Sequence, residues 1–160
     1  METPPVNPLF AVWGTSSENV FAVGSEGTIL HYNGSNWSIM ESGIFFSLHG
    51  VWGSSATDVF AVGAGGILRY DGQGWQRMNC PTEATLFDVW GSSASEVFAC
   101  GFGTTIIFYD GTKWYKMSPE LPESVPNSLF YGIWGSSSNN VFSVGSSGVI
   151  LHYDGNSEGA

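Results

Sequence analysis

The side chains of this sequence that could do chemistry are few, and two of them stand just before repeated tryptophans. Asp88 lies two residues before one tryptophan, where the related segments carry only alanine or glycine. His49 lies three residues before another, where the related segments carry phenylalanine or tyrosine. A carboxylate and an imidazole beside aromatic rings could hold a small ligand or a sugar, although such rings could also pack inside the fold. The candidate ligand-binding residues are Asp88, His49, Phe10, Phe87 and Tyr131.

Two histidines, His31 and His152, share one repeated position and raise the question of a metal site. Arg69 and Phe108 fill that position in the other repeats. Metal sites need three or four ligands, and no carboxylate recurs here at ligand spacing. We therefore expect both histidines to pack between repeats with local hydrogen bonds, and we expect no metal and no cofactor.

An acidic or amide residue ends the loop after each repeated tryptophan. These residues could hold calcium or sugar hydroxyls, but they could also hydrogen-bond the turn backbone, which every repeat needs. Asp88 with one of the two acidic members would be the carboxylate pair of a glycoside-processing enzyme, yet no local spacing supports such a pair. No catalytic residue is therefore predicted. The four loop residues are Asn19, Asp58, Glu96 and Asn140.

One sequence pattern occurs four times and must position these side chains. Each copy begins with Trp-Gly-Ser/Thr-Ser, has Val-Phe seven residues after the Trp, and has a glycine three residues after the Phe. The intervals between successive tryptophans are 39, 38 and 44 residues. A period near 40 residues without helical periodicity indicates small repeated sheets. The four tryptophans are Trp13, Trp52, Trp90 and Trp134.

Each repeat divides into four strand-like runs, which in the second copy are residues 47–52, 58–62, 66–70 and 75–78. Asp-Gly or Asn-Gly pairs suit tight hairpins between the third and fourth runs. Runs such as Val-Phe-Ala-Val-Gly are apolar on both faces, as a sheet buried between two others requires. The fold class is therefore all-β: a β-propeller of four-stranded antiparallel blades, four per chain. We expect one domain over residues 1–160, with blades at about 6–40, 45–80, 84–118 and 128–156.

The repeats resemble bacterial β-propeller repeats marked by Trp-Gly-Ser-Ser and Val-Phe-Ala-Val-Gly. They are distantly similar to kelch propellers through the order Gly63, Tyr70, Trp75, and to Asp-box propellers through Asp71-Gly72-Gln73-Gly74-Trp75. They depart from both, because kelch repeats usually carry paired glycines and an Asp-box has one residue between Asp and Gly. The resemblance implies a propeller fold over nearly the whole chain and says little about function, since propellers host lectins, scaffolds, assembly factors and enzymes.

The fourth repeat stops before its last strand, which leaves the closure of the ring open. Residues 157–160 and 1–5 could share that strand and close four blades into a ring, although Pro4 and Pro5 would weaken it. Two chains could instead pair their open edges into an eight-bladed ring, making a homodimer. A third alternative is that the chain is half of a longer array.

Charge narrows the range of partners. The chain has 4 Lys and Arg against 14 Asp and Glu, for a net charge of −10. Phosphate binding needs clustered positive charge, so nucleic acid is not an expected partner. No run of 18 apolar residues occurs, so no membrane insertion is expected. Cys80 and Cys100 stand in unlike positions, so they favour neither a disulfide nor a metal site, and the compartment stays open, with a secreted or cell-surface location preferred.

These observations favour a non-enzymatic binding or scaffolding module that recognises a protein or a glycan through one rim or the channel mouth. The alternatives are a glycoside-processing enzyme or accessory domain and a purely structural array. The proline-rich, acidic insertion at residues 118–128 is a further candidate for specificity, because departures from a repeat often carry it, but it could also be a neutral surface insertion.

Overall fold

The computed structural model describes residue 4, residues 7–118 and residues 128–155 of the 160-residue chain. Within these ranges the regular structure is β-strand, apart from two short 3-10 helices. The strands form four separate sheets, one from each sequence repeat, and each sheet is antiparallel with its strands in chain order. The predicted β-propeller architecture of four-stranded blades is confirmed, with three strands described in the fourth blade.

Each sheet is a blade, and the blades are numbered here in chain order. The first blade contains β1 (Leu9–Ser16), β2 (Asn19–Gly24), β3 (Ile29–Tyr32) and β4 (Trp37–Met40). The second contains β5 (Leu48–Ser55), β6 (Asp58–Gly63), β7 (Gly66–Tyr70) and β8 (Trp75–Met78). The third contains β9 (Leu86–Ser93), β10 (Glu96–Gly101), β11 (Ile106–Tyr109) and β12 (Trp114–Met117). The fourth contains β13 (Phe130–Ser137), β14 (Asn140–Gly145) and β15 (Ile150–Tyr153). The 3-10 helices η1 (Ser25–Gly27) and η2 (Ser146–Gly148) follow β2 and β14.

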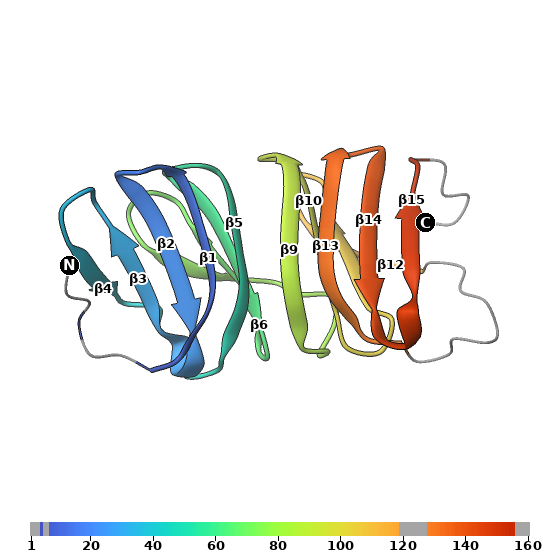
Figure 1. Cartoon of the computed structure of the whole chain (residues 1–160), viewed down its shortest axis with the longest axis horizontal. Helices are drawn as coiled ribbons and strands as arrows, with labels where there is room; N and C mark the ends of the chain where they lie inside the picture. Colours follow the sequence, from blue (N-terminus) through green and yellow to red (C-terminus); the bar gives the residue numbers. More distant parts are fainter. Residues whose placement is uncertain (1–3, 5–6, 119–127, 156–160) are drawn as a thin grey trace.

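The blades stand side by side in an open arc. Figure 1 shows the innermost strands β1, β5, β9 and β13 in the middle, with the outer strands of the first and fourth blades at opposite ends. Hydrophobic clusters join each blade to the next, and among the described residues none joins the fourth blade to the first. The first and fourth blades lie at opposite ends of the described structure, so the four-bladed ring, one of the three closures that the sequence left open, is not seen among the described residues. The predicted shared strand lies outside the described residues, apart from residue 4, as does the interior of the insertion.

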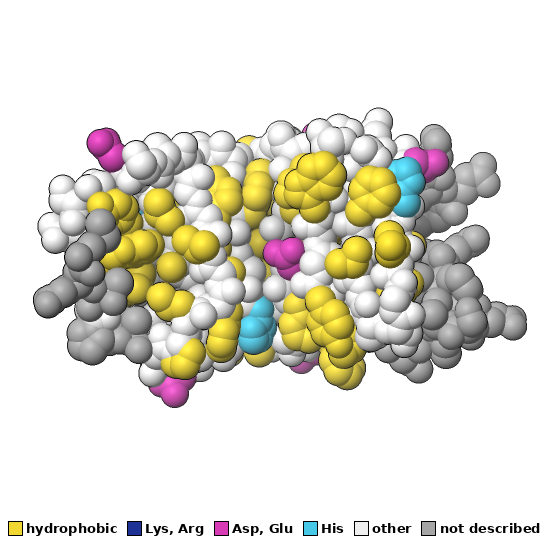
Figure 2. Space-filling view, in the orientation of Figure 1, with side chains coloured by type: hydrophobic (Ala, Val, Ile, Leu, Met, Phe, Trp, Pro, Cys, Tyr) yellow, Lys and Arg dark blue, Asp and Glu magenta, His cyan; other side chains and the backbone are white. Residues whose placement is uncertain are grey.

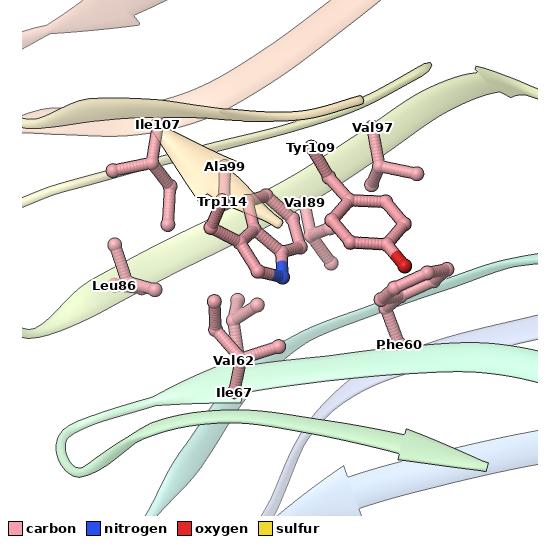
Figure 3. Close-up of a cluster of buried hydrophobic side chains, with 10 residues drawn as sticks. All are labelled: Phe60, Val62, Ile67, Leu86, Val89, Val97, Ala99, Ile107, Tyr109 and Trp114. Atoms are coloured by element: carbon pink, nitrogen blue, oxygen red, sulfur yellow. The ribbon is translucent and has the colours of Figure 1, made fainter. Parts of the chain in front are cut away.

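The core of the molecule lies between blades rather than inside one sheet. Figure 3 shows the cluster between the second and third blades, where side chains of β6 and β7 meet side chains of β9 to β12. Phe60, Val62 and Ile67 contribute from one side, and Leu86 and Trp114 are among the residues on the other. The Val-Phe-Ala runs of β6 and β10 are buried on both faces, as predicted, because each of these two strands lies between two neighbouring blades.

The glycine that ends each second strand is explained by a close backbone approach. A Cβ atom on Gly63 would lie far inside van der Waals distance of the Ser47 carbonyl oxygen. The next residue, Ala64, donates its N–H to that same oxygen at 3.0 Å. Gly24, Gly101 and Gly145 stand in the same relation to the carbonyl groups of Pro8, Thr85 and Leu129. The glycine therefore lets the chain entering each blade pack against the end of its second strand.

The Trp-Gly-Ser-Ser segment is placed differently from our expectation. We predicted that the residues after the tryptophan form a turn, but Gly53, Ser54 and Ser55 continue the first strand of the blade. Ser55 pairs with Asp58 across a tight turn, and a register irregularity occurs between Gly53 and Ser55. The Gly- and Ser-rich composition was misleading here, because Gly53 is a strand residue packed under the Trp13 ring and the exposed Ser54 and Ser55 continue the same strand.

Candidate functional site

Four predicted site residues form one continuous row on the innermost strands, one from each blade. The rings of Phe10 and His49 are stacked with their centroids 5.4 Å apart. The His49 and Phe87 rings meet edge to face at 5.9 Å, and the Phe87 and Tyr131 rings are 5.8 Å apart. We call Phe10, His49, Phe87 and Tyr131 the aromatic row. Because each member touches only the next along the arc, the row presents a strip of rings rather than a closed pocket.

A β-bulge positions every member of the row. In each blade the pairing of the first two strands shifts register at the residue three positions before the repeated tryptophan, so that Phe10, for example, lies between the paired residues Leu9 and Ala11. His49, Phe87 and Tyr131 occupy the same unpaired place in their blades. A bulge leaves the extra residue out of the ladder and re-aims its side chain. Sequence spacing found these residues, but the bulge that turns them out of the blade was not predicted.

The two ends of the aromatic row are open to solvent. Phe10 is 51% exposed and Tyr131 is 54% exposed, whereas His49 and Phe87 between them are half-buried. Partial burial lowers the pKa of the His49 imidazole below its usual value, because removing the ring from water disfavours the charged form. At neutral pH the row is therefore an uncharged, largely apolar surface.

Asp88 lies next to the row in sequence and ties the third blade to the fourth. Its Oδ2 accepts the backbone N–H of Ile133 at 2.9 Å, and its Oδ1 accepts the N–H of Val89 at 2.9 Å. Burial raises the pKa of the Asp88 carboxyl, and the two backbone hydrogen bonds act against that shift. A Cβ on Gly50 of the second blade would come within 2.9 Å of the Asp88 Cα atom, so the axis is crowded at this level. The observed contacts thus give Asp88 a bridging role between blades.

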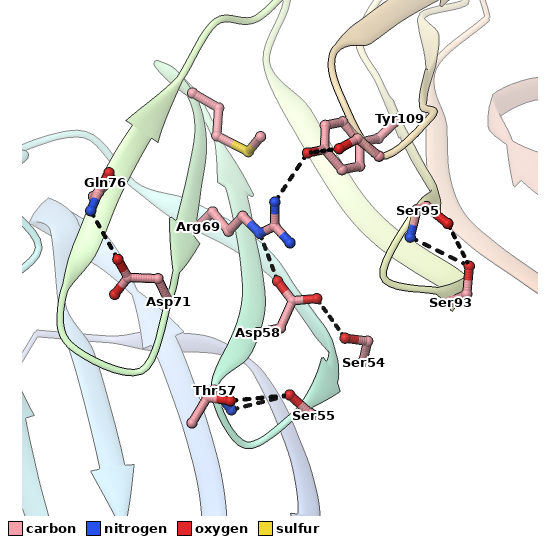
Figure 4. Close-up of polar contacts among 12 residues, drawn as sticks. Ser54, Ser55, Thr57, Asp58, Arg69, Asp71, Gln76, Ser93, Ser95 and Tyr109 are labelled. Atoms are coloured by element: carbon pink, nitrogen blue, oxygen red, sulfur yellow. Dashed lines mark hydrogen bonds and ion pairs between the residues drawn. The ribbon is translucent and has the colours of Figure 1, made fainter.

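A second polar group lies at the turn between the first two strands of the second blade. Arg69 donates from Nε to Asp58 at 2.6 Å and from Nη1 to the Tyr109 hydroxyl of the third blade at 3.0 Å (Figure 4). Ser54 donates its hydroxyl to the same carboxylate, and the guanidinium lies over the Phe60 ring, 5.0 Å from its centroid. The group is an interblade clamp in which Arg69 links Asp58 of the second blade to Tyr109 of the third.

The other blades show the same position with matched substitutions. His31 bonds to Asn19 at 2.7 Å, and His152 bonds to Asn140 at 2.8 Å. Histidine is thus paired with an amide where arginine is paired with a carboxylate. In the third blade Phe108 replaces the cation, and the Glu96 carboxylate accepts the Ser92 hydroxyl at 2.7 Å. In the part of the chain that the structure describes, no cluster of three His, Cys, Asp or Glu side chains could hold a metal ion.

The carboxylate pairs considered for glycoside chemistry are not brought together. Asp88 is near the start of β9, whereas Glu96 pairs with Ser93 at the end of that strand. Five residues of extended strand separate the two levels by roughly 16 Å. Glycosidases place their two carboxyl groups about 5–9.5 Å apart. Asp58 lies at the corresponding turn of the second blade, where its carboxylate forms an ion pair with Arg69.

Both cysteines are free thiols. Cys100 is fully buried at a position where the other repeats carry valine, and burial raises the pKa of its thiol to about 12. Cys80 is half-buried, and burial also raises the pKa of its thiol. Neither group has the lowered pKa of a reactive cysteine.

Comparisons with known proteins support the fold and leave the family open. No protein-family model matches the sequence, and no curated protein matches it. Among solved structures, YCF48 from Cyanidioschyzon merolae aligns with a TM-score of 0.70 and 18% identity, over 91% of this chain and 50% of that one. A structure described as YCF48 bound to D1 peptide aligns with a TM-score of 0.47 and 16% identity, over 93% of this chain and 66% of that one. The chain thus spans half the length of the first of these structures, and the likeness shows a shared fold.

Proposed function

We propose that this chain is a non-enzymatic recognition module that binds an extended protein segment along the aromatic row. The observation that carries the proposal is the row itself, which is continuous across four blades and exposes Phe10 and Tyr131 at its ends. Aromatic rings provide large contact area at a small cost in conformational entropy, and they dominate binding energy at protein interfaces.

Charge defines the segment further. The chain has a net charge of −10, so an acidic segment would be repelled and a neutral or basic one attracted. The row contains no ionised side chain at neutral pH, which suits apolar or aromatic residues of the partner. A segment with apolar side chains spaced along the arc and a basic residue beside them fits this surface best.

Glycan recognition is the second candidate, and exposed aromatic faces on a surface with few charges favour it. Only 11% of the residues of this chain are charged, and rings of this kind also stack on sugars. A purely structural array, or an accessory domain of a glycoside-processing enzyme, would use the same blades without a ligand on the row. The separation given above for Asp88 and Glu96 does not suit a pair of catalytic carboxyl groups.

Selection from a random peptide display library, in parallel with a glycan array, tests the proposal. We expect peptides rich in aromatic and basic residues to be enriched, and Tyr131→Ala to weaken their binding by about tenfold or more. Phe45→Ala is the matched control, because Phe45 is 92% exposed and lies outside the row. Enrichment on the glycan array alone would favour the second candidate. Binding that Phe45→Ala abolishes and Tyr131→Ala leaves intact would overturn the assignment to the row.

A further inference from the structure

Each contact between successive blades repeats the same pair of interlocking features. The first is a tryptophan that lies over a glycine of the next blade: a Cβ on Gly53 would be 2.6 Å from the Trp13 ring. Gly91 meets the Trp52 ring at 2.6 Å, and Gly135 meets the Trp90 ring at 2.7 Å. These three glycines are buried. The glycine in Trp-Gly-Ser-Ser is therefore the receptor for the tryptophan of the preceding blade.

The second feature joins the phenylalanine of one blade to the tyrosine of the next. Phe21 contacts Tyr70 with ring centroids 5.7 Å apart, and Phe60 contacts Tyr109 at 5.6 Å. Phe98 contacts Tyr153 at 5.8 Å. Three blade contacts are thus built alike: a forward face with Trp and Phe meets a rear face with Gly and Tyr.

The forward face of the fourth blade has the forward features but no receptor among the described residues. Trp134 is 60% exposed, whereas the three equivalent tryptophans are half-buried. Val144 is 47% exposed and Ile150 is 69% exposed. The equivalents of Ile150 are at most 5% exposed. They are Ile29, Ile67 and Ile106.

The rear face of the first blade has the complementary deficit. Gly14 is exposed, and the nearest atoms to a Cβ built there belong to its own blade, in Asn19 and Val20. Leu9 is 42% exposed and Val12 is 67% exposed, while the residues equivalent to Val12 are at most 7% exposed. Farther out, Ala22 and Leu30 are buried, so the open part of this face is the part near the axis. Figure 2 shows hydrophobic side chains in patches across one side of the molecule, with no Lys or Arg visible among them.

We propose that these two end faces bind each other in a second copy of this chain, giving a two-chain, eight-bladed ring. The fourth blade of each copy packs on the first blade of the other, so that Trp134 lies over Gly14 of the second copy. The occupant is a second copy because each end face carries the half of the repeated contact that the other lacks. In a twofold dimer the forward face of each chain packs on the rear face of the other, so both end faces of both chains are covered. Such a head-to-tail contact gives a closed ring when the rotation between the two chains closes on itself.

Ring closure also completes the aromatic row. Within the chain, successive members of the row have ring centroids 5.4–5.9 Å apart. The two exposed members, Phe10 and Tyr131, are at its ends, and closure places Tyr131 of one copy beside Phe10 of the other. The row then becomes a ring of eight side chains around one channel. Dimer formation itself does not depend on the proposed ligand.

Light scattering on a sizing column over a concentration series measures the association directly. We expect twice the single-chain mass of 17.2 kDa at high concentration. Val12→Glu on the rear face and Ile150→Glu on the forward face should each weaken association by roughly 100-fold or more. The ring has two contacts between chains, and each substitution places one buried charge in each of these apolar contacts. Phe45→Glu, at an exposed residue outside both faces, should leave the mass unchanged. Near-ultraviolet circular dichroism verifies that each variant is folded.

Mixing the two weakened variants tests the head-to-tail arrangement. Together they retain one intact contact, between the forward face of the Val12→Glu chain and the rear face of the Ile150→Glu chain. The mixture should form a heterodimer more readily than either variant alone forms a homodimer. A single-chain mass at every concentration would overturn the proposal. So would a dimer that only Ile150→Glu weakens, since that pairs two forward faces, or masses that grow without limit, since those indicate an open filament.

Discussion

The contacts between neighbouring blades and the two end faces are built from the same residues, yet they differ in what covers them. Ile67 is fully buried between the second and third blades, whereas Ile150, at the same repeat position, is 69% exposed. Trp52 lies over Gly91, whereas no described residue receives Trp134. A repeat therefore encodes a face and its complement, but not the number of blades that meet.

The largest effect should come from truncating isoleucine at one repeat position, first in a covered blade contact and then in the uncovered end face. Ile67→Ala should lower the free energy of unfolding by about 2–5 kcal/mol, because it leaves a cavity in a closed contact. Ile150→Ala should change the stability of the single chain by less than about 0.5 kcal/mol, because that side chain is already in water. Urea unfolding at low and high protein concentration separates the two. Equal losses that are independent of concentration would mean that the fourth face is covered within the chain.

Removing the polar bridge between the third and fourth blades should have the next largest effect. Asp88→Ala leaves the N–H of Ile133 without its acceptor, and we expect a loss of about 1–3 kcal/mol in unfolding free energy. Ala11 fills the equivalent position in the first blade, so the smaller side chain itself is compatible with the strand. Chemical denaturation gives the free energy, and amide hydrogen exchange at Ile133 should be faster in the variant. Unchanged exchange there would contradict the bridging role.

The rim clamp should contribute less, because it is partly in solvent. Arg69→Gln removes the contacts with Asp58 and with Tyr109 of the next blade, and we expect about 0.5–1 kcal/mol. His152→Gln is the matched variant on the fourth blade, where the histidine bonds only within its blade, to Asn140. It should cost less than the Arg69 change. Thermal unfolding of both variants measures the difference, and a larger loss for His152→Gln would contradict the account of the clamp.

The smallest effects should come from the titration of carboxyl groups. With rising pH, stability should change in one direction through the carboxyl group at a blade contact and in the other through those at the turns. Asp71 and Asp110 each accept two backbone N–H groups of a turn, and these bonds, with the Thr112 hydroxyl at Asp110, lower both pKa values. Their contribution to stability is present above the unfolded pKa of about 4 and is lost as the pH falls through the folded values. Burial raises the pKa of Asp88, so its contribution is present at low pH and is lost as the pH rises through the folded value.

Carbon-13 NMR of the carboxyl groups measures these titrations residue by residue. Asp110→Asn supplies a control, since Asn33 occupies that position in the first blade and its Oδ1 accepts two turn N–H groups at 2.9 and 3.1 Å. The variant should keep the fold and lose the titration. A midpoint for Asp88 below those of the turn carboxyl groups would contradict the burial of its side chain.

Much of the site could be predicted from sequence because the repeat aligns equivalent positions. The offsets from each tryptophan identified the aromatic row and singled out Asp88 as the one charged residue at a position of small ones. The bulge that turns the row outward was not predictable, because a register shift depends on both paired strands. Nor was the bond from Asp88 to Ile133, whose partners lie 45 residues apart in the chain.

The repeat in the sequence defines the blade: its strand order, its Asp-Gly and Asn-Gly hairpin turns, and the positions of its repeated glycines. These properties depend on residues close together in the sequence, and the same pattern of residues occurs in all four copies. The tertiary structure was needed to show that the described blades form an open arc, that Asp88 joins two of them, and that two apolar faces among the described residues are uncovered. Curvature accumulates over several packed contacts between blades, so closure of the ring depends on angles that no single repeat contains.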